Sequence, residues 1–273
     1  MSECTHNCST CGASCADRAA PQSLRKAPHP ESRIGKVFGV VSGKGGVGKS
    51  TVTAMLAAAV QRRGARAAIL DADITGPSIP RAFGIRGTVE GDANGIYPRQ
   101  SNMGIKIVSS NLLLDDETDP VIWRGPVIAG MVKQFWTDVV WDDVDFMFVD
   151  MPPGTGDVPL TVFQSIKLDG IIIVTSPQDL VSMIVEKAVK MANKMDIRIY
   201  GVVENMSYIV CPDCGKRIEI FGSDKVDKVA KDFNLKVLGK LPMDQKVAFA
   251  VDNGDVEILN TDALKPALDE IEG

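Results

Sequence analysis

Short apolar runs alternate with longer amphipathic stretches over most of the chain. The apolar runs are rich in Val, Ile and Phe and are bounded by glycine or polar residues, which is typical of strands buried on both faces of a sheet. Between them, apolar residues recur at helical spacing. This alternation predicts parallel βαβ units, and hence an α/β fold with one doubly wound, mostly parallel sheet flanked by helices. The predicted strands cover 37–41, 66–70, 105–109, 145–150, 170–175, 197–203 and 237–241, and the predicted helices cover 49–63, 180–195, 225–233, a segment from about 126 and a short acidic segment at the C-terminus.

Residues 1–33 lack this pattern. The segment is polar, is rich in Ser, Ala and Pro, and has prolines at positions 21, 28 and 30 that mark a linker. We therefore expect two parts, a cysteine-rich N-terminal tail and linker over 1–33 and a single α/β domain over 34–273.

The stretch from Val37 to Thr51, VFGVVSGKGGVGKST, joins a strand pattern, a glycine-rich loop and an alanine-rich helix. The complete G-x-x-x-x-G-K-S spacing favours a loop that binds nucleotide phosphates over a structural glycine turn, and predicts the P-loop NTPase type of fold. Glycines let backbone N-H groups approach phosphate oxygens, and the N-terminus of the following helix adds its dipole. Lys49 would bind the β- and γ-phosphates, and the Ser50 hydroxyl would be a ligand for Mg²⁺. The predicted phosphate-binding residues are Gly43, Lys44, Gly45, Gly46, Val47, Gly48, Lys49, Ser50 and Thr51.

Carboxylates follow two of the predicted strands. Asp71 and Asp73 follow 66–70 in DADITGPSIP, and Asp150 ends 145–150 before the glycine-containing MPPGTGD. The carboxyl ends of parallel strands meet at the sheet edge where ligands bind. Asp150 is placed to hold a Mg²⁺-bound water. One of Asp71 and Asp73 is placed to orient water or to reach Mg²⁺ through water. The alternative for Asp71 and Asp73 is that they cap the turn that follows them. Together with the phosphate-binding loop, these acids predict nucleotide hydrolysis.

Composition narrows the class of protein. With 273 residues and 45% hydrophobic content, the chain is able to bury a full core. The net charge of -5 argues against broad attachment to nucleic acid or anionic lipid, so we expect neither partner. No apolar run approaches the ~20 residues of a membrane span, and the N-terminus lacks a signal-peptide core. The expected location is the cytoplasm, where structural disulfides are rare.

The six cysteines fall into two groups, and their spacing is read first as metal chemistry. The group in the tail has C-x3-C-x2-C-x3-C spacing, so four thiolates are able to surround one metal ion or one cluster. The spacing matches neither a bacterial ferredoxin nor an ordinary zinc ribbon. An iron-sulfur cluster is favoured, with zinc and an unmetallated tail as alternatives. The candidate ligands are Cys4, Cys8, Cys11 and Cys15.

Cys211 and Cys214 form a C-x2-C pair within CPDCG, beyond the predicted strand 197–203. Two thiolates are half of a tetrahedral site, so the other half comes from a second subunit or from the N-terminal cysteines; a dithiol redox couple is the third alternative. We favour a cluster that bridges a homodimer, with zinc as an alternative. A redox couple is less favoured, because the pair precedes a polar turn rather than the helix typical of a redox pair. Asn205, near the end of the same strand, is placed to offer its amide to a purine base.

The order of GKGGVGKST, DADITGPSIP, VIWRGP, FVDMPPGTGD, TSPQDL, GVVENMS and CPDCG resembles the Mrp-type ATPases, also called the Nbp/Ind group, over about residues 34–258. This group is part of the deviant Walker A class of P-loop ATPases, which includes the MinD and ParA proteins. The resemblance implies a homodimeric ATPase that holds a [4Fe-4S] cluster at Cys211 and Cys214 of its two subunits and passes it to apo iron-sulfur proteins. A further N-terminal cluster is known in part of the group, although the cysteines here are packed more tightly than in the eukaryotic members.

The resemblance also implies roles for single residues. Lys44, Lys49 and Asp73 would be catalytic, with Lys44 reaching the partner's ATP and Asp73 contacting the attacking water. Asp71 would support the Mg²⁺ shell beside Ser50 and Asp150, and Asn205 and Pro242 would contact adenine. The expected cofactors are ATP, Mg²⁺ and the [4Fe-4S] cluster. The alternative is an ATP-dependent positioning switch of the ParA or MinD kind with structural zinc sites, which would need a basic surface or a membrane helix that the sequence does not display.

Overall fold

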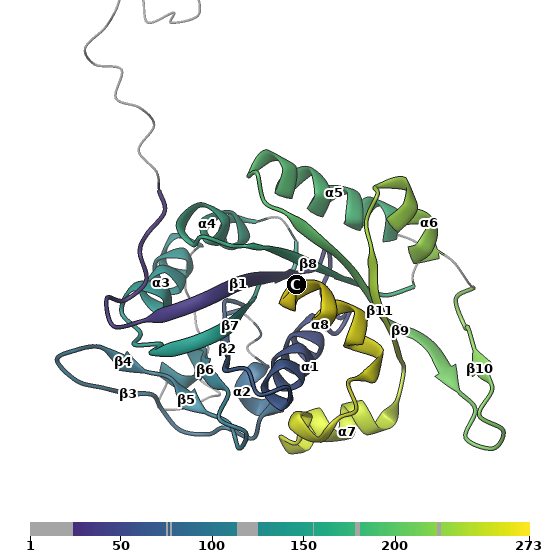
Figure 1. Cartoon of the computed structure of the whole chain (residues 1–273), viewed down its shortest axis with the longest axis horizontal. Helices are drawn as coiled ribbons and strands as arrows, with labels where there is room; N and C mark the ends of the chain where they lie inside the picture. The colour runs from purple at the N-terminus through teal and green to yellow at the C-terminus, as the bar shows by residue number, and fades with distance from the viewer. Residues whose placement is uncertain are drawn as a thin grey trace, which may run out of the picture.

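The computed structural model describes residues 24–74, 76, 78–113, 125–154, 156–177, 181–222 and 225–273. Cys4, Cys8, Cys11 and Cys15 therefore lie outside the described residues. Within the described part, one central sheet is covered by helices on both faces (Figure 1). The predicted fold class, a doubly wound and mostly parallel sheet flanked by helices, is confirmed.

Nine strands of the described chain form the central sheet, in the order β10-β9-β8-β1-β7-β2-β6-β5, with β11 paired to β9. The pairings between the longer strands are parallel, whereas β5 and β10 run antiparallel to their neighbours. The strands are β1 (Arg33–Val41), β2 (Ala67–Asp71), β5 (Arg99–Gln100), β6 (Lys106–Val108), β7 (Asp143–Asp150), β8 (Gly170–Thr175), β9 (Ile199–Val210), β10 (Arg217–Ile218) and β11 (Val237–Pro242), and a separate small hairpin pairs β3 (Glu90–Gly91) with β4 (Ile96–Tyr97).

Alternate side chains of the central strands enter two separate cores. Phe38 and Val40 of β1 pack on the face covered by α1, α2, α7 and α8, while Val37 and Val41 pack on the face covered by α3 to α6. Among the described residues, no helix is long and apolar enough to cross a membrane. The helices are α1 (Lys49–Arg62), α2 (Ile79–Ala82), α3 (Gly125–Thr137), α4 (Asp157–Ser165), α5 (Val181–Lys194), α6 (Lys225–Asp232), α7 (Gln245–Asn253) and α8 (Lys265–Glu272), with 3-10 turns at Ser110–Leu113, Val256–Ile258 and Asp262–Leu264.

The main differences from the predicted elements lie in β9, α4 and α7. β9 continues to Val210, because its backbone goes on pairing with β11 and then with β10 although polar residues interrupt the apolar run. The helices α4 and α7 were not predicted. Both are short, and α7 is defined mainly by its ends: the Asp244 side chain accepts a hydrogen bond from Lys246 N at 2.8 Å, and Gly254 follows with a φ of 81°.

The end of the predicted linker packs on the domain. Lys26 N donates to Ser165 O at 2.7 Å, and Trp136 Nε1 donates to Lys26 O at 2.9 Å. Ser32 Oγ accepts a hydrogen bond of 2.9 Å from Trp141 N. Residues 24–32 are thus attached to α3, α4 and the start of β7.

Candidate nucleotide site and cysteine hairpin

The phosphate-binding loop connects the carboxyl end of β1 to the N-terminus of α1. Gly46 and Gly48 have φ angles of 78° and 76°, a region that glycine adopts readily. A Cβ on Gly48 would collide with the Asn205 amide, and a Cβ on Gly43 would collide with Ile184 of α5. The glycines are therefore required both by backbone conformation and by close packing.

The loop encloses a cavity of about 240 Å³ at the start of α1. Eight of the nine predicted phosphate-binding residues, Lys44 to Thr51, line it, while Gly43 packs toward α5. Asp73 and Pro153 complete the wall. The first turn of α1 contains no acidic residue and no side-chain cap, so its N-H groups and its dipole are available to an anion.

Lys49, Ser50 and Asp150 converge below this cavity. Lys49 Nζ lies 2.8 Å from Asp150 Oδ2 and 3.7 Å from Asp73 Oδ2. Ser50 Oγ donates to the same Asp150 oxygen at 2.6 Å. Because Lys49 and Asp150 are almost fully buried, each charge depends on the other for compensation. A hydroxyl and a carboxylate oxygen in contact are hard oxygen donors of the kind that Mg²⁺ prefers.

Thr53 is a residue that the sequence pattern did not single out. Its Oγ1 donates to Asp150 Oδ1 at 2.7 Å, so both carboxylate oxygens of Asp150 are held by α1. Thr53 lies three positions after Ser50 and thus on the same side of the helix. That spacing is the signal that was available in the sequence.

Asp71 lies fully buried in the register position beside Asp150. Its Oδ2 accepts a hydrogen bond of 2.9 Å from Ser109 Oγ, and its Oδ1 accepts one of 3.1 Å from the backbone N of Asp73. Burial raises the pKa of Asp71 well above its ordinary value, and the charge of Asp150 raises it further. Asp71 therefore orients the segment that carries Asp73, and Ser109, which the sequence did not reveal, orients Asp71.

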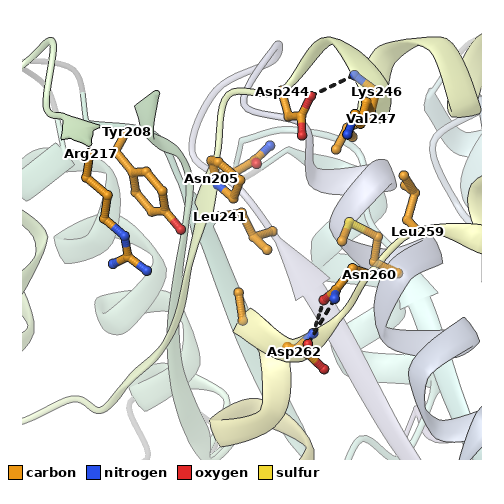
Figure 2. A pocket seen from close by; sticks show the side chains of 13 residues that line it. Asn205, Tyr208, Arg217, Leu241, Asp244, Lys246, Val247, Leu259, Asn260 and Asp262 are labelled. Carbon is orange, nitrogen blue, oxygen red and sulfur yellow. Dashed lines mark hydrogen bonds between the residues drawn. The ribbon is translucent and has the colours of Figure 1, made fainter. Parts of the chain in front are cut away.

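Asn205 lies within β9, just beyond the part paired with β8, and Pro242 is the last residue of β11. Asn205 is one residue beyond the last β9 position paired with β8, and its Nδ2 donates to Val47 O at 2.9 Å. Asn205 and Pro242 both line a cavity of about 320 Å³ that reaches Gly48 and Thr51. They also line a larger cavity of about 590 Å³ (Figure 2). The predicted base-binding residues thus lie together beside the phosphate-binding loop.

Cys211 and Cys214 lie in the turn between β9 and β10, which we call the cysteine hairpin (residues 208–218). The turn is closed by hydrogen bonds of 2.9 Å from Cys211 N to Lys216 O and from Gly215 N to Cys211 O. The pKa of the Cys211 thiol is lowered, because the backbone N-H groups of Cys214 and Asp213 and the Cys214 thiol all point at its sulfur. Stabilised thiolate is the form that binds metals.

This thiol pair is an incomplete metal site. Both cysteines are free thiols at the molecular surface. Within the described ranges, no group of three or more His, Cys, Asp or Glu residues is placed to hold a metal ion. The donor set fits a soft metal or an iron-sulfur cluster, provided that further ligands come from outside the described part of this subunit.

The loop has the G-x-x-x-x-G-K-S spacing and lies at the carboxyl edge of a parallel sheet, and its Lys49 contacts Asp150 at the end of β7. This is the arrangement of the P-loop NTPases, and the protein is one of them. Its chemistry is the binding and hydrolysis of a nucleoside triphosphate. The family model for ParA-type NUBPL iron-transfer P-loop NTPases matches residues 33–272. The chain belongs to this family, which confirms the resemblance seen in its sequence.

Curated relatives carry a common name. An iron-sulfur cluster carrier protein of Clostridium perfringens is 46% identical over 82% of this chain and 81% of the relative. A protein of the same name from Methanocaldococcus jannaschii is 44% identical over 93% of this chain and 90% of the relative.

Solved structures show the same fold. A nucleotide-binding protein of Archaeoglobus fulgidus, solved in complex with ADP and with cobalt, is 41% identical, covers 85% of this chain and 91% of its own, and has a TM-score of 0.77. The cell division ATPase MinD of Pyrococcus furiosus is 20% identical, with coverage of 87% and 98% and a TM-score of 0.60. At that identity MinD shows the fold alone.

Proposed function

We propose that the protein is an ATP-binding and ATP-hydrolysing iron-sulfur cluster carrier that works as a homodimer in the cytoplasm and passes [4Fe-4S] clusters to apo-proteins. The observation that carries this proposal is the half-complete thiol site on the cysteine hairpin. The hairpin is continuous with β9, and β9 also contains Asn205, whose amide contacts the phosphate-binding loop. The names of the clostridial and methanogen relatives support it.

In the nucleotide site, we assign Lys49 to the β- and γ-phosphates of ATP and Asp73 to the attacking water. Ser50 and Asp150 would hold Mg²⁺, with Asp71 as support, and the bound ion would neutralise charge on the phosphates. Lys44, which lines the loop cavity, would reach the nucleotide of the partner subunit. Asn205 and Pro242 would contact the adenine base.

In the cluster site, Cys211 and Cys214 of two subunits related by a two-fold axis would supply the four thiolates of a [4Fe-4S] cluster. Apolar side chains around the pair support a buried interface, since they are 39–51% exposed in the single chain. The apolar side chains are Val210, Ile218, Ile220 and Phe221.

Cys4, Cys8, Cys11 and Cys15 would hold a second cluster.

The two sites would be coupled through the dimer. ATP bound by Lys49 of one subunit and Lys44 of the other would order the loops that carry Asp73 and Asp150, and hydrolysis would release them. Movement of the subunits would change the spacing between the two cysteine hairpins, and with it the retention of the shared cluster.

The test is cluster assembly and transfer under anaerobic conditions. Protein reconstituted with iron and sulfide should show broad absorption near ~400 nm and should restore activity to an apo [4Fe-4S] enzyme. The variant Cys211→Ser/Cys214→Ser should lose transfer. The matched variant with serine at Cys4, Cys8, Cys11 and Cys15 should keep it.

Two results would contradict the proposal. The first is colourless protein with bound zinc that takes up neither iron nor sulfide, which would support the positioning switch with structural zinc. The second is undiminished transfer by Cys211→Ser/Cys214→Ser.

A further inference from the structure

The larger cavity joins the predicted base-binding residues to the cysteine hairpin (Figure 2). It shares Asn205, Pro242, Asp244 and Val247 with the smaller cavity that reaches Gly48 and Thr51 at the phosphate-binding loop. A nucleotide with its phosphates on the loop and its base at Asn205 therefore lies at the entrance of a space whose far wall belongs to the hairpin.

That wall consists of Tyr208 and Arg217. The guanidinium carbon of Arg217 lies 4.5 Å from the centroid of the Tyr208 ring, a cation-π contact between β9 and β10. Figure 2 shows the two side chains next to each other on the hairpin side of the pocket, with Asp244, Lys246 and Val247 at the start of α7 across from them. Tyr208 is three residues before Cys211, and Arg217 is three residues after Cys214.

We infer that Tyr208 and Arg217 contact the purine base of the bound nucleotide, so that the position of the cysteine hairpin depends directly on whether a base is bound. A flat aromatic base suits a planar guanidinium and a phenol ring, which stack on its face. The inference rests on the nucleotide site of the proposed function. It adds a route between the nucleotide and the cysteines that runs within one subunit and does not depend on the loops of Asp73 and Asp150.

The backbone of β9 is irregular between Asn205 and Tyr208, so the hairpin is able to move relative to the phosphate-binding loop at this point. Met206, between Asn205 and Tyr208, has a φ of 57°, a conformation that non-glycine residues rarely adopt. The pairing with β11 is irregular at the same point, since Lys240 pairs with Glu204 and Pro242 pairs with Tyr208. Beyond the irregularity, Met243 N donates to Tyr208 O at 2.8 Å and ties the hairpin to the strand of Pro242. Contact of the base with Tyr208 would therefore hold the hairpin relative to the loop.

The experiment compares Arg217→Ala with Arg198→Ala in the full-length, cluster-free protein. Arg198 is the matched control, because its guanidinium carbon lies 4.2 Å from the Tyr200 ring centroid at the opposite end of β9, outside the pocket. Two quantities are measured: the Kd of MgADP, and the rate at which iodoacetamide alkylates Cys211, followed by peptide mass spectrometry with and without MgADP.

In the wild type and in Arg198→Ala, MgADP should slow alkylation of Cys211 by at least about fivefold. Arg217→Ala should weaken MgADP binding by about tenfold and abolish the nucleotide effect on Cys211. Tyr208→Ala, which removes the ring that Arg217 contacts, should behave as Arg217→Ala.

Wild-type affinity in Arg217→Ala, or a Cys211 alkylation rate that MgADP leaves unchanged in the wild type, would overturn the inference. Neither assay uses iron or sulfide. Failure of the carrier function would appear instead in the cluster transfer assay, so the two failures are distinguishable.

Discussion

The Asp150 carboxylate is the residue on which the nucleotide site converges. One oxygen contacts Lys49 Nζ and Ser50 Oγ, and the other contacts Thr53 Oγ1, all within 2.8 Å. Asp150 is fully buried, so its charge is tolerated only because these groups compensate it. A side chain held at both oxygens presents its charge in one orientation, which is what a metal-water ligand requires.

Replacing Thr53 by valine tests this arrangement. Thr53→Val keeps the side-chain shape but removes the donor to Asp150 Oδ1. The free energy of unfolding should fall by about 1–3 kcal/mol, the cost of a buried acceptor that loses its partner. The kcat of ATP hydrolysis should fall by about tenfold, since Asp150 would no longer be fixed.

Thr137→Val is the control for this substitution. Its hydroxyl contacts Lys133 O on its own helix and the Asp138 carboxylate, and Thr137 does not line the loop cavity. Thr137→Val should leave kcat unchanged. Equal kcat and equal unfolding free energy for Thr53→Val and the wild type would show that the contact does not position Asp150.

Thr53 and Ser109 show where residue-level prediction from sequence ends. Lys49, Ser50 and Asp150 could be predicted because their spacing from glycines and apolar strands is specific. Thr53 is an ordinary threonine in an alanine-rich helix, and Ser109 is an ordinary polar residue after a strand. Their roles come from pairing of distant elements: the register of Leu70 with Val108 brings Ser109 beside Asp71.

Among the elements, the long strands of the sheet and the short helices α6 and α8 could be predicted, whereas the helices α4 and α7 could not. Strands buried on both faces give continuous apolar runs, and β1, β7 and β8 were recognisable for that reason. The helices α4 and α7 have exposed apolar side chains, Leu160 and Phe249, which blur the helical period of apolar residues, although both are longer than α6 and α8. The extension of β9 to Val210 depends on strand partners far away in sequence, which no local pattern shows.

The pairing of β2 with β7 includes an ion pair with a measurable pH effect. Arg66 Nε and Nη2 contact the two carboxylate oxygens of Asp145 at 3.0 and 2.8 Å. This side-chain contact, with a hydrogen bond from Arg66 N, lowers the pKa of Asp145 to about 2. Because folding lowers the pKa of Asp145, the ion pair stabilises the fold at pH values above the unfolded pKa of ~3.9. This stabilisation is lost as the pH falls through the pKa of Asp145 in the folded protein.

Asp145→Asn should therefore lower the free energy of unfolding at pH 7 by about 1 kcal/mol, a modest value because the pair is partly exposed and screened. The difference between the wild type and the variant should shrink as the pH falls from 5 to about 2. Urea unfolding at each pH measures it. A difference that stays constant over this range would mean that the ion pair does not stabilise the β2–β7 edge.

For the molecule as a whole, we propose that two subunits share one cluster. Most of the predicted phosphate-binding residues line one cavity of this chain, whereas the thiol pair on the cysteine hairpin is half of a site, with exposed apolar side chains near it in sequence. Within the described residues, the thiol pair offers two of the four ligands that a cluster needs, and we propose that a second copy supplies the other two. This difference makes the stoichiometry of the loaded protein the decisive quantity.

The most direct measurement is native mass spectrometry of the anaerobically reconstituted protein. It is made on the full chain with serine at the four N-terminal cysteine positions, so that only Cys211 and Cys214 remain. We expect a dimer that carries the mass of one [4Fe-4S] cluster, and loss of that cluster in the additional variant Cys211→Ser. A cluster bound to the monomer, or a dimer that keeps its cluster after Cys211→Ser, would show that the two subunits do not share a cluster through Cys211 and Cys214.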